Sequence, residues 1–67
     1  MIEIEILRRL TEEMNISVSA LARFCHCSPS AMANYVRGVS LPTGAKLIGI
    51  KEGLRKYKEM INQIIEE

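Results

Sequence analysis

The residues most able to do chemistry lie in one short segment, Cys25-His26-Cys27, which contains both cysteines and the only histidine of the chain. Thiolate and imidazole groups bind zinc, but a tetrahedral site needs four ligands, or three and a water molecule. Three consecutive residues at a helix end point in different directions, and no second cluster supplies the missing ligands. We therefore predict no metal site here, and no cofactor.

Redox chemistry is the second possibility for this segment. A disulfide between Cys25 and Cys27 would close a very small ring, and Cys-x-Cys is not the usual redox spacing. The alternative is that both cysteines are small apolar residues of the interior, where free cysteine is common. Because no signal peptide or membrane-spanning segment is evident, we expect a cytoplasmic protein with reduced thiols and no membrane partner.

No other group of residues indicates catalysis. The carboxylates lie toward the two ends of the chain, His26 has no evident acidic neighbour, and no glycine-rich phosphate loop occurs. Glu12-Glu13 and Glu66-Glu67 are most simply solvated helix faces. We expect a protein that is not an enzyme and has no small-molecule ligand.

The size and charge of the chain are more informative. A chain of 67 residues buries only about 60% of its unfolded surface and has room for one core, so we expect a single domain over residues 1–67. No acidic residue occurs from Met14 to Lys51, and this block contains four cationic residues. A basic block is typical of a phosphate-binding surface, although a solvated mixed surface explains it about as often. The cations are Arg23, Arg37, Lys46 and Lys51.

Helix signals dominate the first half of the chain. Apolar residues recur at i, i+3, i+4 and i+7 over residues 3–14, which predicts a first helix, and Asn15 tolerates the left-handed conformation that ends one. Ser17 or Ser19 fits the N-cap of a second helix that ends near Cys25.

Two more helices are predicted after this corner. Ser28-Pro29 combines an N-cap with a first-turn proline, and Gly38 is a stop after Arg37. A fourth helix follows Thr43 as its cap. Gly49 and Gly53 each cost about 1 kcal/mol in a helix interior, so we expect a bend or break near Gly53, and five helices, or four with a long kinked last one.

The fourth helix has a heptad-like apolar seam of Leu47, Ile50, Leu54, Tyr57, Ile61 and Ile64. In one interpretation the seam from Leu54 to Ile64 folds back over the protein's own core. In the other, the helix of about residues 54–66 forms the contact of a homodimer, and both can hold at once. The residues predicted for the dimer contact are Tyr57, Met60, Ile61, Ile64 and Ile65.

In the centre of the chain, two short helices meet at His26-Cys27, and Ala22 provides the small residue at their crossing. Over about residues 7–54 the chain resembles the lambda-repressor-like helix-turn-helix family, which includes phage Cro and repressor proteins. The resemblance implies an all-α bundle of four to five helices with a helix-turn-helix at about 18–37. Its motifs are Leu7-x-x-Leu10, Asn15-Ile16-Ser17, Leu21-Ala22, Cys27-Ser28, Met32-x-x-Tyr35, Gly38-x-x-x-Pro42 and Leu47-x-x-Ile50.

The resemblance also implies a function. A homodimeric transcription regulator, of the phage or mobile-element repressor type, would bind double-stranded DNA with its third helix in the major groove. Asn34 can pair with adenine, Ser30 can donate or accept, and Ala31 can contact a thymine methyl group. Hydroxyl groups and helix starts can hold phosphates. The DNA-binding residues implied are Ser17, Ser28, Pro29, Ser30, Ala31, Asn34, Arg37, Ser40, Thr43 and Lys46.

The chain also departs from the family pattern. His26 stands where a glycine is usual, Val18 replaces a glutamine, and neutral Thr11 and Val36 replace an Arg–Glu pair. Loss of both members leaves no buried charge unpaired, so the fold is unaffected. His26 is interpreted as an exposed turn residue in a left-handed conformation. The alternative function is a helix-turn-helix module that binds a protein partner, as an antitoxin-like or adaptor protein, without reading DNA.

Overall fold

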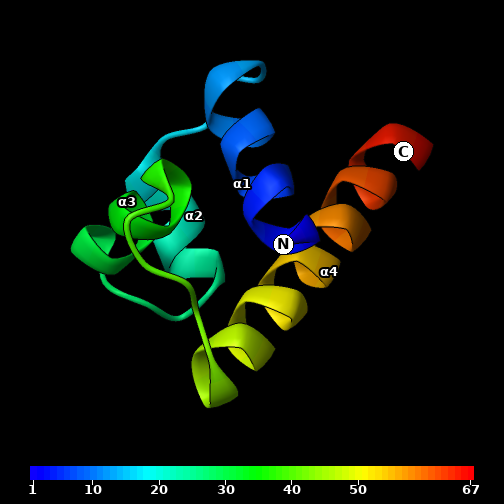
Figure 1. The fold of residues 1–67 in the computed structure, drawn as a ribbon. Coiled ribbons are helices and arrows are strands. Elements are labelled where there is room, and N and C mark those ends of the chain that lie inside the picture. The colour runs from blue at the N-terminus through cyan, green and yellow to red at the C-terminus, as the bar shows by residue number, and fades with distance from the viewer.

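The computed structural model describes all 67 residues and contains only helices as regular structure. Figure 1 shows the three shorter helices beside α4, which forms one long rod. Helix α2 packs against α3 and α4, and α1 packs against α3. No helix has a stretch long and apolar enough to cross a lipid bilayer. The helices are α1 (Ile2–Glu12), α2 (Val18–Phe24), α3 (Pro29–Arg37) and α4 (Gly44–Glu66), so the predicted all-helical fold is confirmed.

Serine side chains begin the two central helices. The Ser17 hydroxyl accepts a hydrogen bond from the Ala20 N–H, and the Ser28 hydroxyl accepts one from the Ala31 N–H, each at 3.1 Å. Each bond satisfies an N–H group that has no partner inside the helix. Ser17, not Ser19, is therefore the cap of α2, and the Ser28-Pro29 start of α3 is confirmed.

Two residues other than glycine have a left-handed backbone, Asn15 (φ 57°) and His26 (φ 56°). Both were predicted to adopt it, although α1 ends at Glu12, two residues earlier than expected. At the second position the chain turns sharply, and the Cys27 N–H donates to the Ala22 carbonyl oxygen at 3.0 Å. His26 is exposed, so its observed role is in the backbone turn between α2 and α3.

The core is assembled around this turn and draws on all four helices. No polar or charged side chain is buried. Ala22, 1% exposed, lies in the core as a small residue at the helix crossing should. Cys27, expected to be buried, is half-buried and packs against the core from outside. The buried apolar residues are Ile4, Leu7, Leu21, Ala22, Cys25, Met32, Tyr35 and Ile50.

Helix α4 is continuous over 23 residues. Of the two predicted alternatives, the chain therefore has four helices with a long last one, and the break near Gly53 with a separate helix from residue 54 is wrong. The reason is a close approach between helices. A methyl group added at Gly53 would lie 2.5 Å from the Phe24 carbonyl oxygen, and one at Gly49 would lie 3.0 Å from that of Cys25. The two glycines let α4 approach the backbone at the end of α2, and this packing offsets their low helix propensity.

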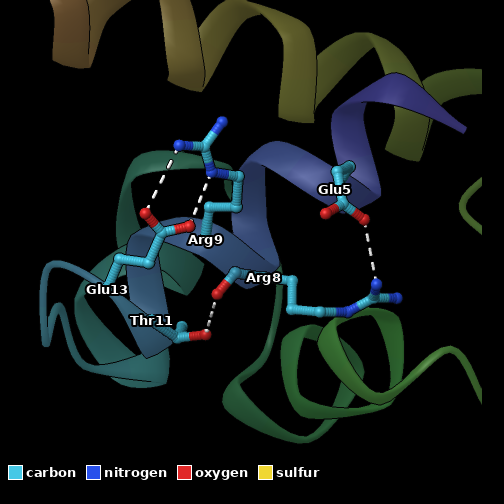
Figure 2. Close-up of polar contacts among 5 residues, drawn as sticks. All are labelled: Glu5, Arg8, Arg9, Thr11 and Glu13. Atoms are coloured by element: carbon cyan, nitrogen blue, oxygen red, sulfur yellow. Dashed lines mark hydrogen bonds and ion pairs between the residues drawn. The ribbon is translucent and has the colours of Figure 1, made fainter.

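Helix α1 carries its own counter-charges. Arg8 pairs with Glu5 at 2.9 Å and Arg9 pairs with Glu13 at 2.6 Å, and both pairs lie on the surface (Figure 2). The hydrogen bond and the charge of Arg9 lower the pKa of Glu13. The Thr11 hydroxyl donates to the Arg8 carbonyl oxygen at 2.8 Å. The two cations of α1 are thus already neutralised by carboxylates of the same helix or its end.

Candidate nucleic-acid interface

The starts of three helices carry no acidic side chain. Helix α1 has Glu3 and Glu5 in its first turn, whereas the first turns of α2, α3 and α4 have none. The N-terminus of a helix carries a partial positive charge and free N–H groups, which favour an anion. At α2, α3 and α4 no carboxylate of the helix itself compensates this charge.

The cations of the central block are free of ion pairs. The three ion pairs of the chain lie in α1 with its C-terminal end and in the C-terminal half of α4. All four basic residues of the acid-free block are exposed and take part in none of them. The block between Met14 and Lys51 therefore has a positive surface that carboxylates do not neutralise.

The outer face of α3 is polar. Ser30, Asn34 and Arg37 are spaced by four and three residues, which places them on one side of the helix. Ser30 and Arg37 are exposed and Asn34 is half-buried. Ala31, predicted for the same outer face, is half-buried and packs against the core. Ala31 lies one turn before the buried Tyr35, so the two residues share the side of α3 that faces the interior.

Asn34 is not free in this structure. Its Oδ1 accepts a hydrogen bond from Nη2 of Arg37 at 2.7 Å. Its NH₂ group is left as a donor, and the carbonyl oxygen keeps a second lone pair, so both groups that a bidentate pair with adenine requires can still be used. The contact with Arg37 therefore orients the Asn34 amide and does not exclude that pair.

Hydroxyl groups surround the starts of α3 and α4. The Ser28 hydroxyl accepts its cap bond and keeps its own O–H to donate. Thr43 is at the N-cap of α4 as predicted, but its side chain makes no cap hydrogen bond. Ser40, Thr43 and Lys46 are all exposed, in the loop before α4 and in its first turn. Ser17 and Pro29, also assigned to DNA by the resemblance, are exposed.

The cysteine segment is part of the packing between helices. The Cys25 thiol donates to the Ile50 carbonyl oxygen with Sγ 3.9 Å away. Burial, with a smaller contribution from Cys27, raises the pKa of Cys25 to about 11. Burial also raises the pKa of Cys27, against the opposing effect of Lys46. Both thiols are free, and no three His, Cys, Asp or Glu side chains lie where they could hold a metal ion.

A second surface lies between α1 and α4. An open groove of about 480 Å³ has an apolar lining of Ile6, Leu10, Leu54, Tyr57 and Ile61. Leu54 and Tyr57 are half-buried, and the Tyr57 ring meets that of Phe24 edge to face at 5.2 Å. Nothing in the sequence had identified the two α1 residues as part of a shared surface, because helical spacing alone does not show which elements adjoin.

The seam of α4 is only partly covered by the rest of the chain. Ile61 is 37% exposed and Ile64 61% exposed. The prediction that the seam folds back over the core therefore holds for Leu54 and Tyr57 and is wrong for these two residues. The other residues predicted for a dimer contact, Met60 and Ile65, are exposed.

No protein family, no curated protein and no solved structure matches the chain. Its function is therefore inferred from its own residues. Two surfaces are available for binding: the polar outer face of α3, which lies in the acid-free segment, and the groove between α1 and α4.

Proposed function

We propose that this chain binds double-stranded DNA as a small homodimeric transcription regulator of the repressor type. Helices α2 and α3 would form a lambda-repressor-like helix-turn-helix, with α3 in the major groove. The observation that carries the proposal is the polar face of α3, formed by Ser30, Asn34 and Arg37, within a segment that has no acidic residue. The major groove admits a helix, and side chains of these types recognise base edges.

The packing of α2 supports this arrangement. A helix that reads DNA must be held firmly by its neighbours, so that its outer face keeps one orientation. Leu21 and Ala22 of α2 share a buried cluster with Met32 and Tyr35 of α3. The turn through His26 brings the two helices together with few connecting residues. Helix α2 is thus suited to position α3.

The phosphate groups of DNA would be held around α3. The N-terminal end of α4, which has no side-chain cap, the hydroxyls of Ser28 and Thr43, and the side chain of Lys46 all offer donors or positive charge. Phosphate contacts fix the position of a protein on the duplex, whereas base contacts specify sequence. This division assigns positioning to the loop before α4 and recognition to α3.

The contact between Asn34 and Arg37 gives each a role on binding. In a bidentate pair with adenine, the Asn34 carbonyl accepts from the base amino group and the Asn34 amide donates to the ring nitrogen. The Arg37 guanidinium uses one N–H for Oδ1 and keeps four further N–H donors, which can bind a phosphate. Arg37 can thus hold the Asn34 amide in place and contact the DNA backbone in the same complex.

The first experiment measures binding to a random DNA duplex over a range of salt concentrations. Affinity should fall steeply with salt, since each neutralised phosphate contributes a slope of about 0.9 in log affinity against log salt concentration. Lys46→Ala should reduce the slope by about one. Arg9→Ala is the matched control and should leave the slope unchanged, because Arg9 is already paired with Glu13 on α1. Binding that does not depend on salt, or no binding, would favour the alternative of a protein-interaction module.

The second experiment selects bound sequences from a random DNA library. A dimer should enrich a site with two-fold symmetry. Asn34→Ala should lose preference at one position of each half-site, a cost of about 1–3 kcal/mol. Gln63→Ala removes the amide of an exposed residue near the far end of α4 and should keep the selected sequence. If Asn34→Ala selects the same site with the same affinity, Asn34 does not read the DNA.

A further inference from the structure

The C-terminal half of α4 lacks a partner. Every residue from Lys58 to Glu67 is exposed, among them Met60, Ile61, Ile64 and Ile65. Helical turns without packing are marginal in water, because most helical stability in proteins comes from a buried apolar face. A helix end that exposes this much apolar surface needs a cover.

The charges at this end are also uncompensated. The last turn of α4 contains no basic residue, and Glu66 and Glu67 stand beside the negative end of the helix dipole. Carboxylates are unfavourable there and cations are favourable. The missing partner should therefore offer both an apolar surface and positive charge.

The groove between α1 and α4 offers this combination. Its floor is apolar, and Arg55 and Lys58 are among its lining residues. Helix α1 packs against α3 and leaves this part of α4 open. In Figure 1, α1 and the C-terminal half of α4 diverge from the place where α1 begins. The lining of the groove includes Ile61 and Asn62, so the groove extends along α4 into its uncovered end.

We propose that this groove holds the C-terminal half of α4 from a second copy of the chain, with the two α4 helices antiparallel about a two-fold axis near Ile61. The proposal rests on the homodimer of the proposed function and specifies its geometry. Two-fold symmetry makes the contact reciprocal, so that each copy supplies one groove and one helix end. Ile6 and Leu10 of α1 thereby become part of the interface, in addition to the seam of α4.

The order of charges along α4 sets the direction of the two helices. Arg55 and Lys56 precede Ile61 by six and five residues, and Glu66 and Glu67 follow it by five and six. In an antiparallel pair centred on Ile61, the cations of each helix lie opposite the carboxylates of the other. A parallel pair would place like charges opposite each other, which is destabilising.

The side of the helix on which each charge lies agrees with this pairing. Arg55 and Glu66 are eleven residues apart, and so are Lys56 and Glu67. At about 3.6 residues a turn, eleven residues make roughly three turns, so each pair shares one flank of α4. An antiparallel two-fold pair brings like flanks together, which places Arg55, a lining residue of the groove, near the second copy's Glu66. Lys56 and Glu67 lie on the side of α4 away from the groove and add only longer-range attraction between the two helices. The exposed contact of Arg55 with Glu59, at 3.2 Å, is weak enough to be shared or exchanged.

Paired charge reversals test the direction. One variant is R55E/K56E and the other is E66K/E67K; all four side chains are exposed, and circular dichroism checks that each variant is folded. Each variant alone should dimerise at least about tenfold more weakly than the wild type, and a mixture should form a heterodimer within about threefold of wild-type affinity, as measured by sedimentation. Wild-type dimerisation of either variant alone, a mixture that does not recover, or a monomeric wild type at micromolar concentration would overturn the proposal.

A second pair of variants tests the groove. Ile6→Ser changes a lining residue that is 41% exposed, and Ile2→Ser changes an isoleucine of the same helix that is 76% exposed and outside the groove. Dimerisation should weaken for Ile6→Ser and stay unchanged for Ile2→Ser. Equal effects of the two would show that α1 is not part of the contact and would overturn the groove as the docking site.

The outcomes separate this inference from the proposed function. If the mixture of charge-reversed variants dimerises but no duplex binds, the dimer contact holds and DNA binding fails. If the wild type binds a two-fold site while the mixture does not recover, DNA binding holds and the antiparallel contact is wrong. If α4 instead docks an unrelated peptide, the wild type stays monomeric without it, and the contact proposed here is wrong.

Discussion

The two halves of α4 carry the same apolar pattern in opposite surroundings. Ile50 is fully buried against α2, whereas Ile64, on the same seam and of the same type, is 61% exposed. Gly53 lies against the backbone of Phe24, while the half beyond Tyr57 touches little of its own chain. The comparison shows that periodicity identifies an apolar face but not what covers it. In the first half the cover is α2; in the second we propose a second copy.

The largest difference between the halves should appear when the same substitution is made in each. Ile50→Ala removes a fully buried side chain and should lower the free energy of unfolding by about 2–5 kcal/mol. Ile64→Ala should change it by less than about 0.5 kcal/mol in the monomer, since it is largely exposed there. Both variants are measured by urea denaturation in the R55E/K56E background. This background weakens the dimer, so that dimerisation does not add to the measured stability.

A comparable loss of stability for Ile50→Ala and Ile64→Ala would contradict the proposed difference between the two halves of α4. A large loss for Ile64→Ala in the monomeric background would mean that the C-terminal half folds onto the chain after all. In that case Ile64→Ala should lower the free energy of unfolding by the same amount when Arg55 and Lys56 are restored. The proposed dimer instead requires a larger loss for Ile64→Ala when these two residues are present.

Much of the local structure could be predicted because its causes are local. Ser17 and Ser28 cap helices through hydrogen bonds to residues three positions away, and Asn15 and His26 occupy left-handed turns that few residues tolerate. Such local hydrogen bonds and turns can be recognised from the spacing of residues in the sequence. The acid-free block could be located as well, because the order of charged residues is visible in the sequence.

What could not be predicted depends on contacts between distant elements. Gly53 weakens a helix by propensity, and only the position of Phe24 shows why it is needed. Ala31 was predicted on the outer face of α3, but it is half-buried and packs against the core. The contact of Asn34 with Arg37 depends on side-chain rotamers. In the candidate site, the residue types could therefore be predicted but not how they are engaged.

A smaller effect should distinguish the two glycines of the packed half. Gly53→Ala puts a methyl group 2.5 Å from the Phe24 carbonyl oxygen, and the forced separation of helices should cost about 1–3 kcal/mol. At Gly49 the nearest atom is 3.0 Å away, so a gain of about 1 kcal/mol in helix propensity should nearly cancel the strain. In thermal unfolding, the midpoint temperature of Gly53→Ala should be well below that of Gly49→Ala. The reverse order would mean that propensity, not close approach, governs this part of α4.

The smallest effect concerns the thiol between α2 and the first half of α4. Burial raises the pKa of Cys25 from its ordinary value of 9.0 to about 11. Because the raised pKa belongs to an acid, the folded state favours the neutral thiol. This contribution to stability is complete below pH 9 and is lost as the pH rises from 9 to 11, as the unfolded chain releases the proton first.

Between pH 7 and pH 10, the free energy of unfolding should therefore fall by about 1 kcal/mol from this group alone. Cys25→Ala should show a smaller loss over the same range, and Cys27→Ala, whose thiol is only half-buried, should keep most of the wild-type dependence. Comparing the changes with pH, instead of the absolute stabilities, removes the cost of the cavity that Cys25→Ala leaves. Parallel losses in the wild type and Cys25→Ala would show that Cys25 does not titrate with unfolding. If stability falls at high pH only in the proteins that retain Cys25, the titration of this thiol causes the loss. The Cys25 thiol donates to the Ile50 carbonyl oxygen, so the affected contact is the one between α2 and the first half of α4.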